Sequence, residues 1–141
     1  MRRIAAVALT AGTLMAGMAA VGAPAEAATG WKPYDSYSGI DAWGTYSRSG
    51  GKTYVKGYLR DTKKNGWTAC VRFLFTEGTN KYWSRFKIIG VTSGGTKYNY
   101  DGKATVSISV SSSYSSHLWV QECGRSKSTG KYYYGKGKKL F

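Results

Sequence analysis

Acidic residues and histidine are scarce in this chain of 141 residues. It has seven aspartates and glutamates against 21 lysines and arginines, and its single histidine is His117. Any Ser-His-Asp or Cys-His triad would have to be built around that one imidazole. A lone histidine at a strand entrance is far more often a surface residue than a catalytic base. Motifs for metals, nucleotides and haem are missing as well, so we expect no cofactor.

The few carboxylates also narrow the hydrolase classes. A glycosidase needs two carboxyl groups facing each other across a cleft. Turn chemistry accounts for Asp61 and Asp101, which leaves Glu77 and Glu122 as weak candidates that sequence spacing cannot pair. The full set of acidic residues after the leader is Asp35, Asp41, Asp61, Glu77, Asp101 and Glu122.

A small basic ribonuclease is the enzymatic alternative. Such an enzyme needs a general base, a general acid and an arginine for the phosphate, for which Glu122, His117 and Arg72 are candidates. The sequence offers no supporting helix. Its basicity suits RNA but suits any other anionic ligand equally, so nucleic acid is not the expected partner.

A long apolar run occurs once, at the start of the chain. Arg2 and Arg3 precede a stretch of apolar and small residues from 4 to 21, and Ala25 and Ala27 are the small residues that signal peptidase requires. These features predict a signal peptide over residues 1–27. No later run approaches the roughly 20 residues of a membrane span. We therefore expect a secreted, extracellular protein without a membrane span.

Removal of the leader would leave one strongly basic domain. The remaining 114 residues suffice for a modest core, and they keep 19 of the basic and 6 of the acidic residues, a net charge of +13. Such a charge favours anionic partners of several kinds, including teichoic acid, acidic polysaccharide and acidic proteins.

Cysteine is limited to two residues, Cys70 and Cys123. In an exported chain an even count predicts one disulfide rather than a metal site. A bridge closing a loop of 53 residue steps would stabilise the fold by about 4 kcal/mol. Both cysteines alternate with the aliphatic residues of their segments, so the bridge should lie off the main core face and join neighbouring strands or an edge.

Leucine and methionine become scarce after the leader, whereas every Trp, Tyr and Phe follows it. This composition is typical of sheets rather than of amphipathic helices. The predicted strands alternate apolar and polar residues, and Gly, Ser or Asn turns separate them. Those strands cover Ile40–Arg48, Lys52–Asp61, Thr68–Glu77, Lys81–Ile89, Thr96–Tyr100, Ala104–Ser112, His117–Cys123 and a last run with Tyr132, Tyr133 and Tyr134.

The pattern predicts an all-β fold, an antiparallel two-sheet sandwich of about seven or eight strands with one disulfide, in preference to a small barrel. Within the run from 104 to 112, Val106, Ile108 and Val110 should point inward. Residues 40–141 would form the sandwich. Residues 28–39 have no strong strand signal and are expected to be an extended N-terminal arm that docks on a partner by β-augmentation. A disordered terminus or an ordinary edge strand is the alternative.

Aromatic and basic residues are the candidate binding groups. Amphipathic rings beside lysines and glycines suit both sugars and protein interfaces, so both partners stay open. The candidate partner-binding residues are Trp31, Tyr34, Tyr37, Trp43 and Trp67. A candidate anionic surface comprises Lys131, Lys136, Lys138 and Lys139, although a solvated basic edge strand explains these lysines equally well.

The segments Gly57-Tyr-Leu-Arg-Asp61 and Gly66-Trp-Thr-Ala-Cys70-Val-Arg-Phe73, together with the Arg2-Arg3 start and the alanine-rich leader, resemble small secreted β-sandwich proteins of high-GC Gram-positive bacteria. Among these the chain resembles the adaptor subunits of secreted umbrella toxin particles, which join a repeat-bearing stalk to lectin-bearing subunits. The resemblance covers most of the mature chain. It implies a non-enzymatic adaptor whose segment around Trp31–Tyr37 engages one protein while a sandwich face engages another.

A secreted interaction module is thus the leading hypothesis from the sequence. A carbohydrate or cell-wall binding module is the second, and a ribonuclease-like toxin is the third.

Overall fold

The computed structural model describes residues 26–90, 102 and 104–141. It is all-β, and every strand pairing is antiparallel. The strands are β1 (Thr29–Trp31), β2 (Ile40–Ser49), β3 (Lys52–Asp61), β4 (Trp67–Glu77), β5 (Asn80–Trp83), β6 (Lys87–Ile88), β7 (Thr105–Ser112), β8 (His117–Ser126), β9 (Tyr132–Tyr134) and β10 (Lys138–Lys139).

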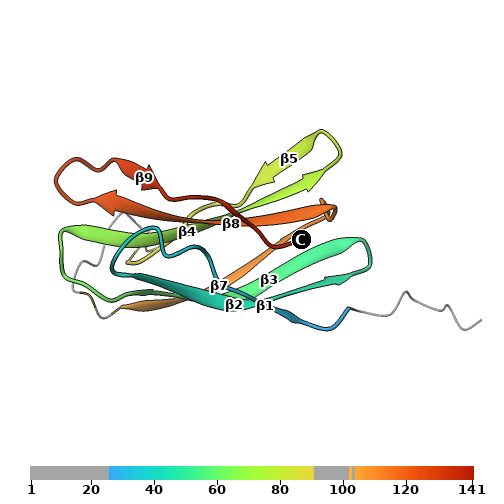
Figure 1. Ribbon diagram of the computed structural model, residues 1–141, viewed down its shortest axis with the longest axis horizontal. Helices are drawn as coiled ribbons and strands as arrows, with labels where there is room; N and C mark the ends of the chain where they lie inside the picture. Colours follow the sequence, from blue (N-terminus) through green and yellow to red (C-terminus); the bar gives the residue numbers. More distant parts are fainter. Residues whose placement is uncertain (1–25, 91–101, 103) are drawn as a thin grey trace, which may run out of the picture.

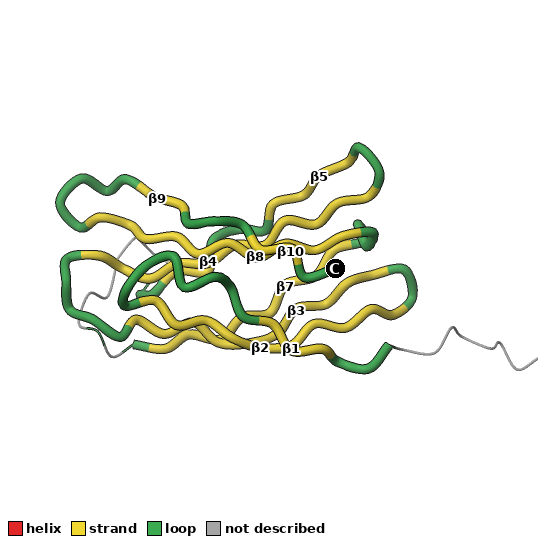
Figure 2. Tube along the Cα trace, viewed as in Figure 1, coloured by secondary structure: helices red, strands yellow, loops and turns green. Residues whose placement is uncertain are grey.

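Two sheets face each other, so the predicted two-sheet sandwich is confirmed (Figure 1). One sheet has the order β1-β2-β3-β7. The other has the order β10-β8-β4-β5, with β6 also paired to β4 and β9 also paired to β8. Figure 2 shows that both layers consist of strands and that turns and loops connect one strand to the next. The four-stranded and six-stranded sheets are named by these sizes below.

The expected count of seven or eight strands is too low, because the described residues form ten. One cause lies in Lys81–Ile89, predicted as a single strand. Ser84 interrupts it: the Phe73 amide donates to Ser84 Oγ at 2.9 Å, and the Ser84 amide donates to the Phe73 carbonyl at 2.8 Å. A side-chain oxygen thus replaces a backbone acceptor, and the regular ladder splits into β5 and β6.

The core lies between the sheets and follows the predicted alternation. Val55 and Leu59 of β3 meet Phe73 and Phe75 of β4, all fully buried. Ile108 is buried as expected, and Val106 and Val110 pack half-buried against the same cluster. Burial of one face per strand is the main favourable contribution to such a fold.

The predicted N-terminal arm is partly built into the sandwich. β1 pairs with β2, and Trp31 is only 4% exposed. Its Nε1 donates to the carbonyl of Lys56 at 3.1 Å, and its ring meets Phe73 edge-on at 5.1 Å. A Cβ at Gly57 would come within 2.8 Å of the Trp31 ring, so the missing side chain gives the indole its space.

The predicted disulfide between Cys70 and Cys123 is confirmed. The two residues are direct partners on β4 and β8, with Cα atoms 4.7 Å apart. They belong to a second buried cluster outside the main core, with Ile88 and partly buried Phe86 and Tyr132. The bridge therefore joins neighbouring strands on the outer side of the six-stranded sheet, as the residue parity predicted.

The C-terminus closes one side of the sandwich. The Leu140 amide donates to the Leu118 carbonyl at 2.8 Å, and the Phe141 ring lies 5.1 Å from that of Tyr46. In Figure 1 the end of the chain lies between the two layers. Contacts to both sheets thus fix the last residues.

The predicted turn at Ser49-Gly50-Gly51 is confirmed, because both glycines adopt positive φ between β2 and β3. Other predictions concern segments outside the described residues. These are residues 1–25 of the leader, the turn at 93–95, the strand at 96–100 and the aspartate of the 101–102 turn.

Candidate functional site

A pocket of about 220 Å³ opens at the end of the sandwich where β4 begins. Its walls come from four separate segments: the loop before β2, the loop after β3, the start of β4, and the facing residues of β8 and β9. The lining residues are Tyr37, Ser38, Gly39, Ile40, Asp61, Asn65, Trp67, Thr68, Ala69, Gly124 and Tyr133.

Two rings of the pocket come from the six-stranded sheet. Trp67 is the first residue of β4, on the same face as buried Ala69, and Tyr133 of β9 is paired with Gly124 of β8. The Trp67 and Tyr133 rings meet edge-on, with centroids 5.1 Å apart. A Cβ on Gly124 would lie 3.3 Å from the Trp67 ring, so this glycine lets the indole lie against the sheet. The inner apolar face thus continues into the pocket.

Two polar residues that line the pocket, Asp61 and Thr68, already have hydrogen-bond partners. Asp61 is buried, and its carboxylate accepts the backbone amides of Lys63 at 3.1 Å and Ala69 at 3.3 Å. Thr68 Oγ1 donates to the Ile89 carbonyl at 3.5 Å. Because these groups serve the fold, the pocket offers mainly ring surface to a ligand.

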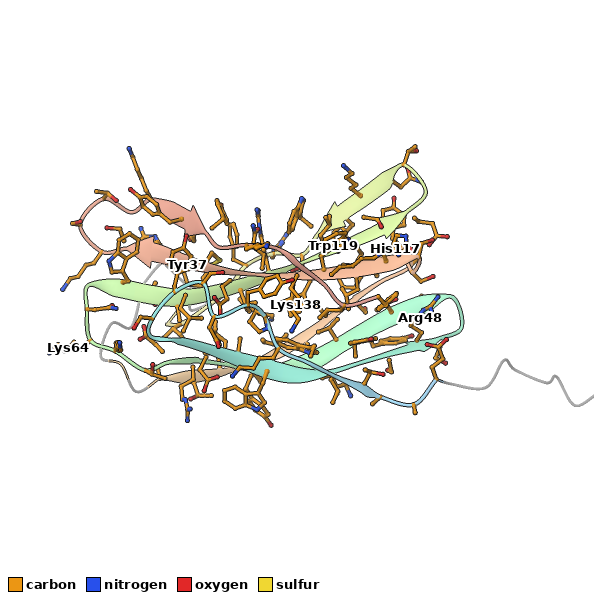
Figure 3. All side chains as sticks on the ribbon, in the orientation of Figure 1. Tyr37, Arg48, Lys64, His117, Trp119 and Lys138 are labelled. Atoms are coloured by element: carbon orange, nitrogen blue, oxygen red, sulfur yellow. A yellow bond between two sulfur atoms is a disulfide. The ribbon has the colours of Figure 1, made fainter. Side chains whose placement is uncertain are left out.

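The segment before β2 forms the third wall and is fixed in place. The Ser36 amide donates to Glu122 Oε2 at 2.8 Å, and the Lys136 amide donates to Ser36 Oγ at 3.1 Å. The Thr62 amide donates to the Gly39 carbonyl at 2.9 Å. These contacts hold Tyr37 beside the six-stranded sheet (Figure 3).

Glu122 anchors this wall from the inner face of β8. Its side chain is 1% exposed, and Oε1 has no hydrogen-bond partner among the residues that the structure describes. Burial raises the pKa of the carboxyl, and the backbone amides of Ser36 and Tyr37 offset only part of that rise. Ionisation of Glu122 therefore has a desolvation cost at the contact between β8 and the segment before β2.

The structure brings two of the five candidate partner-binding residues together, Tyr37 and Trp67. Trp31 lies in the core, so its ring is not available to a partner. Tyr34 is exposed outside the pocket, and Trp43 lies on the outer face of the four-stranded sheet. Sequence reasoning missed Tyr133 as a pocket residue. The available signal was alternation: in the strand Tyr132–Tyr134, Tyr133 faces the side opposite to Tyr132 and Tyr134.

Three of the four lysines of the candidate anionic surface lie near two different aromatic rings. The ammonium groups of Lys136 and Lys138 lie 5.3 and 5.6 Å from the Tyr34 ring centre. Lys139 instead lies 5.9 Å from the Trp119 ring, and Lys131 follows the turn after β8. The first pair also holds the segment before β2, because Lys138 Nζ donates to the Lys32 carbonyl at 2.8 Å.

The candidate ribonuclease residues are not brought to one site. His117 begins β8 near the end of the molecule opposite Tyr37 (Figure 3). Glu122 points into the sandwich, and Arg72 pairs with Gln121 on the outer face of the same sheet. His117, Glu122 and Arg72 therefore cannot act together on one substrate in this arrangement.

Arg72 lies between two aromatic rings and is hydrogen-bonded to a glutamine side chain. Its guanidinium carbon lies 3.9 Å from the Trp83 ring centre and 4.1 Å from that of Tyr134, and its Nε donates to Gln121 Oε1 at 2.8 Å. Burial lowers the pKa of Arg72. The cation joins β4, β5 and β9 above the disulfide, an arrangement for which the sequence contained no specific signal.

Within the described ranges, no three His, Cys, Asp or Glu side chains gather as metal ligands would. Residues 26–90, 102 and 104–141 also contain no helix with the length and apolarity of a membrane span. Comparison with protein-family models, with curated protein sequences and with solved structures gives no match. A functional proposal must therefore start from the chain's own geometry.

Proposed function

We propose that this protein is a non-enzymatic secreted interaction module that acts as an adaptor in an extracellular protein complex. The observation that carries the proposal is the pocket walled by Tyr37, Trp67 and Tyr133. A partner protein inserts one apolar or aromatic side chain there. The resemblance to the adaptor subunits of umbrella toxin particles agrees with such a role.

The size of the pocket favours a side chain over a free small molecule. Small-molecule sites usually measure about 300–1,000 Å³, whereas this pocket has about 220 Å³. Interface hot spots are side chains buried in well-packed pockets, and Tyr and Trp are enriched among them. Trp67 and Tyr133 are 39% and 46% exposed, so a partner would remove substantial ring surface from water.

The surroundings of the pocket suggest the charge of the partner. Lys63 and Lys64 belong to the loop that joins β3 to β4, at the same end of the molecule (Figure 3). The full chain carries a net charge of +14. A partner whose anchor side chain stands among acidic residues would associate faster and be selected over basic competitors.

The test is capture of protein partners from the culture medium of the producing organism. The tag replaces residues 1–25, since Phe141 packs on Tyr46 and a C-terminal tag would disturb that contact. We expect the captured partner to bind Trp67→Ala and Tyr133→Ala at least about tenfold more weakly. Tyr82→Ala is the matched control, because Tyr82 is 44% exposed on β5 away from the pocket.

Two results would contradict the proposal. One is the capture of a partner that binds both pocket variants as tightly as it binds the unaltered chain. The other is retention of the chain on cell-wall material without recovery of any protein.

A further inference from the structure

The outer face of the four-stranded sheet is a regular grid of side chains. Its central strand, β3, presents Tyr54, Lys56, Tyr58 and Arg60 in alternation, all exposed. On either side β2 and β7 place their residues directly opposite these four in the ladder. From one end to the other the rows are Asp41–Arg60–Thr105, Trp43–Tyr58–Ser107, Thr45–Lys56–Ser109 and Ser47–Tyr54–Ser111.

An open groove of about 380 Å³ runs over the middle of this grid. Its side walls include Trp43 and Tyr58, whose rings lie 5.8 Å apart with an interplanar angle of 35°. Gly44, Gly57 and Ile108 line it too, although the side-chain direction of their positions is toward the core. The two glycines are direct ladder partners, and their backbone lines the groove beside Trp43 and Tyr58.

Hydroxyl groups flank the rings on both sides. Ser107, Ser109 and Ser111 form a row on β7, and Thr45 and Ser47 stand on β2. Serine and lysine are depleted at the centres of protein interfaces, so their number on this face argues against a protein partner. Rings beside hydroxyls instead match a sugar, which has apolar ring faces and a periphery of hydroxyl groups.

The charge on this face is positive. Asp41 is paired with Arg60, whose Nη2 lies 2.6 Å from Asp41 Oδ2, and the same guanidinium carbon lies 5.4 Å from the Trp43 ring centre. Lys56 stands between the two tyrosines, and Lys52 lies further along β3. An anionic ligand would therefore be attracted to the grid.

The spacing of the rings indicates a polymer. Tyr54 and Tyr58 are four residues apart on one strand, a distance of about 13 Å at the rise of a β-strand. A single sugar ring cannot contact both, whereas a chain of several sugars lying along β3 contacts both tyrosines and passes Lys56 between them.

We infer that this face binds an acidic polysaccharide, with sugar rings stacked on Trp43, Tyr58 and Tyr54 and a carboxylate or other anionic substituent held by Lys56. This site shares no residue with the pocket at the end of the sandwich. It would therefore be a second binding function, independent of the protein adaptor proposed above.

The test is calorimetric titration of the chain, with its tag in place of residues 1–25, against defined hexasaccharides. Acidic probes are the hexamers of galacturonate, alginate and hyaluronan; neutral probes are maltohexaose, cellohexaose and chitohexaose. We expect at least one acidic hexamer to bind, and more tightly than every neutral one. Trp43→Ala and Tyr58→Ala should each weaken that binding at least tenfold, while Tyr82→Ala, on the other sheet, should change it less than twofold.

A polyphosphate titration separates sugar recognition from simple charge attraction. Lys56→Gln should weaken both polyphosphate and the acidic hexamer, whereas Trp43→Ala should weaken only the hexamer. The inference is overturned if no acidic hexamer binds, if neutral hexamers bind equally well, or if the ring variants keep full affinity. Thermal unfolding of each variant verifies that a lost affinity is not a lost fold.

Discussion

Glu122 shows how one buried residue can set the pH response of the protein. The side chain is fully enclosed on the inner face of β8, and burial raises its pKa above the ordinary glutamate value of 4.5. The contribution of this group to stability is therefore complete below about pH 4.5 and is lost as the pH rises through the folded-state pKa. Each tenfold change in the acid constant corresponds to about 1.4 kcal/mol of unfolding free energy.

The Glu122→Gln variant should remove this contribution. The amide oxygen can still accept the Ser36 amide, but no charge forms at high pH. We expect the unfolding free energy of the unaltered chain to fall relative to the variant as the pH rises from 4.5. Urea unfolding at a series of pH values from 4 to 8 measures the difference, and a difference that is constant or moves the other way contradicts the prediction.

Glu77 provides the control of opposite sign. Its carboxylate is exposed and accepts the Ser115 amide at 2.8 Å, which lowers its pKa. Its contribution is present above the unfolded-state pKa and is lost as the pH falls through the folded-state value. Glu77→Gln should therefore change the pH profile in the reverse direction and only below about pH 4.5, which separates the burial effect of Glu122 from a general effect of removing a negative charge.

At the level of elements, β1 is a structural part of the sandwich rather than a free arm. Its three residues pair with β2, and Trp31 extends from the strand to Phe73 and the Lys56 carbonyl. Loss of a buried tryptophan removes its transfer free energy and leaves a cavity. Trp31 therefore ties the first described residues to the core.

The matched pair Trp31→Ala and Trp43→Ala tests this role. Trp31 is 4% exposed and Trp43 is 37% exposed, on opposite sides of the same sheet. We expect Trp31→Ala to lower the unfolding free energy by about 3–5 kcal/mol and Trp43→Ala to lower it by less than about 1 kcal/mol. Chemical denaturation followed by circular dichroism gives both values; equal losses would show that β1 contributes no more than a surface strand.

The sequence predicted those elements in which alternation was clear. The runs around Val55, Phe73 and Ile108 are each long enough for the alternation of apolar and polar residues to identify the buried face. β1 and β10 are too short for any such signal, and β5 and β6 are separated by a serine hydrogen bond that no pattern encodes. Tertiary partners decide such short strands.

The candidate site was predictable only in part, for a related reason. Tyr37, Trp67 and Tyr133 come from three distant segments, and nothing in their spacing indicates that they meet. The orientation of Glu122 was readable, since it shares the parity of Leu118 and Val120. Its partner, the loop around Ser36, was not, because a loop contact has no periodicity.

At the scale of the whole molecule, the two proposed sites differ in chemistry and lie in different parts of one sandwich. The apolar pocket lies at one end, between segments of both sheets, while the hydroxyl-rich grid covers the outer side of the four-stranded sheet. A rigid scaffold with separate sites suits a protein that joins two partners. The pocket includes residues of β4, β8 and β9, so its shape depends on how firmly the six-stranded sheet is held together.

The disulfide between Cys70 and Cys123 should strengthen the whole fold without being required for it. The bridge lies outside the main core cluster, in which Val55, Leu59 and Phe73 pack across the two sheets. Domains of this size have about 5–15 kcal/mol of stability. Closing a loop of 53 residues contributes about 4 kcal/mol of that through the unfolded state.

We therefore expect the Cys70→Ala/Cys123→Ala double variant to fold into the same all-β structure with an unfolding free energy about 4 kcal/mol lower. Because both cysteines are fully buried, dithiothreitol should leave the native bridge intact and cleave it only in denaturant. Circular dichroism and urea titration measure the first outcome, and thiol counting measures the second. A double variant that is unfolded at 25 °C without denaturant would show that the bridge, rather than the inter-sheet core, determines whether this chain folds.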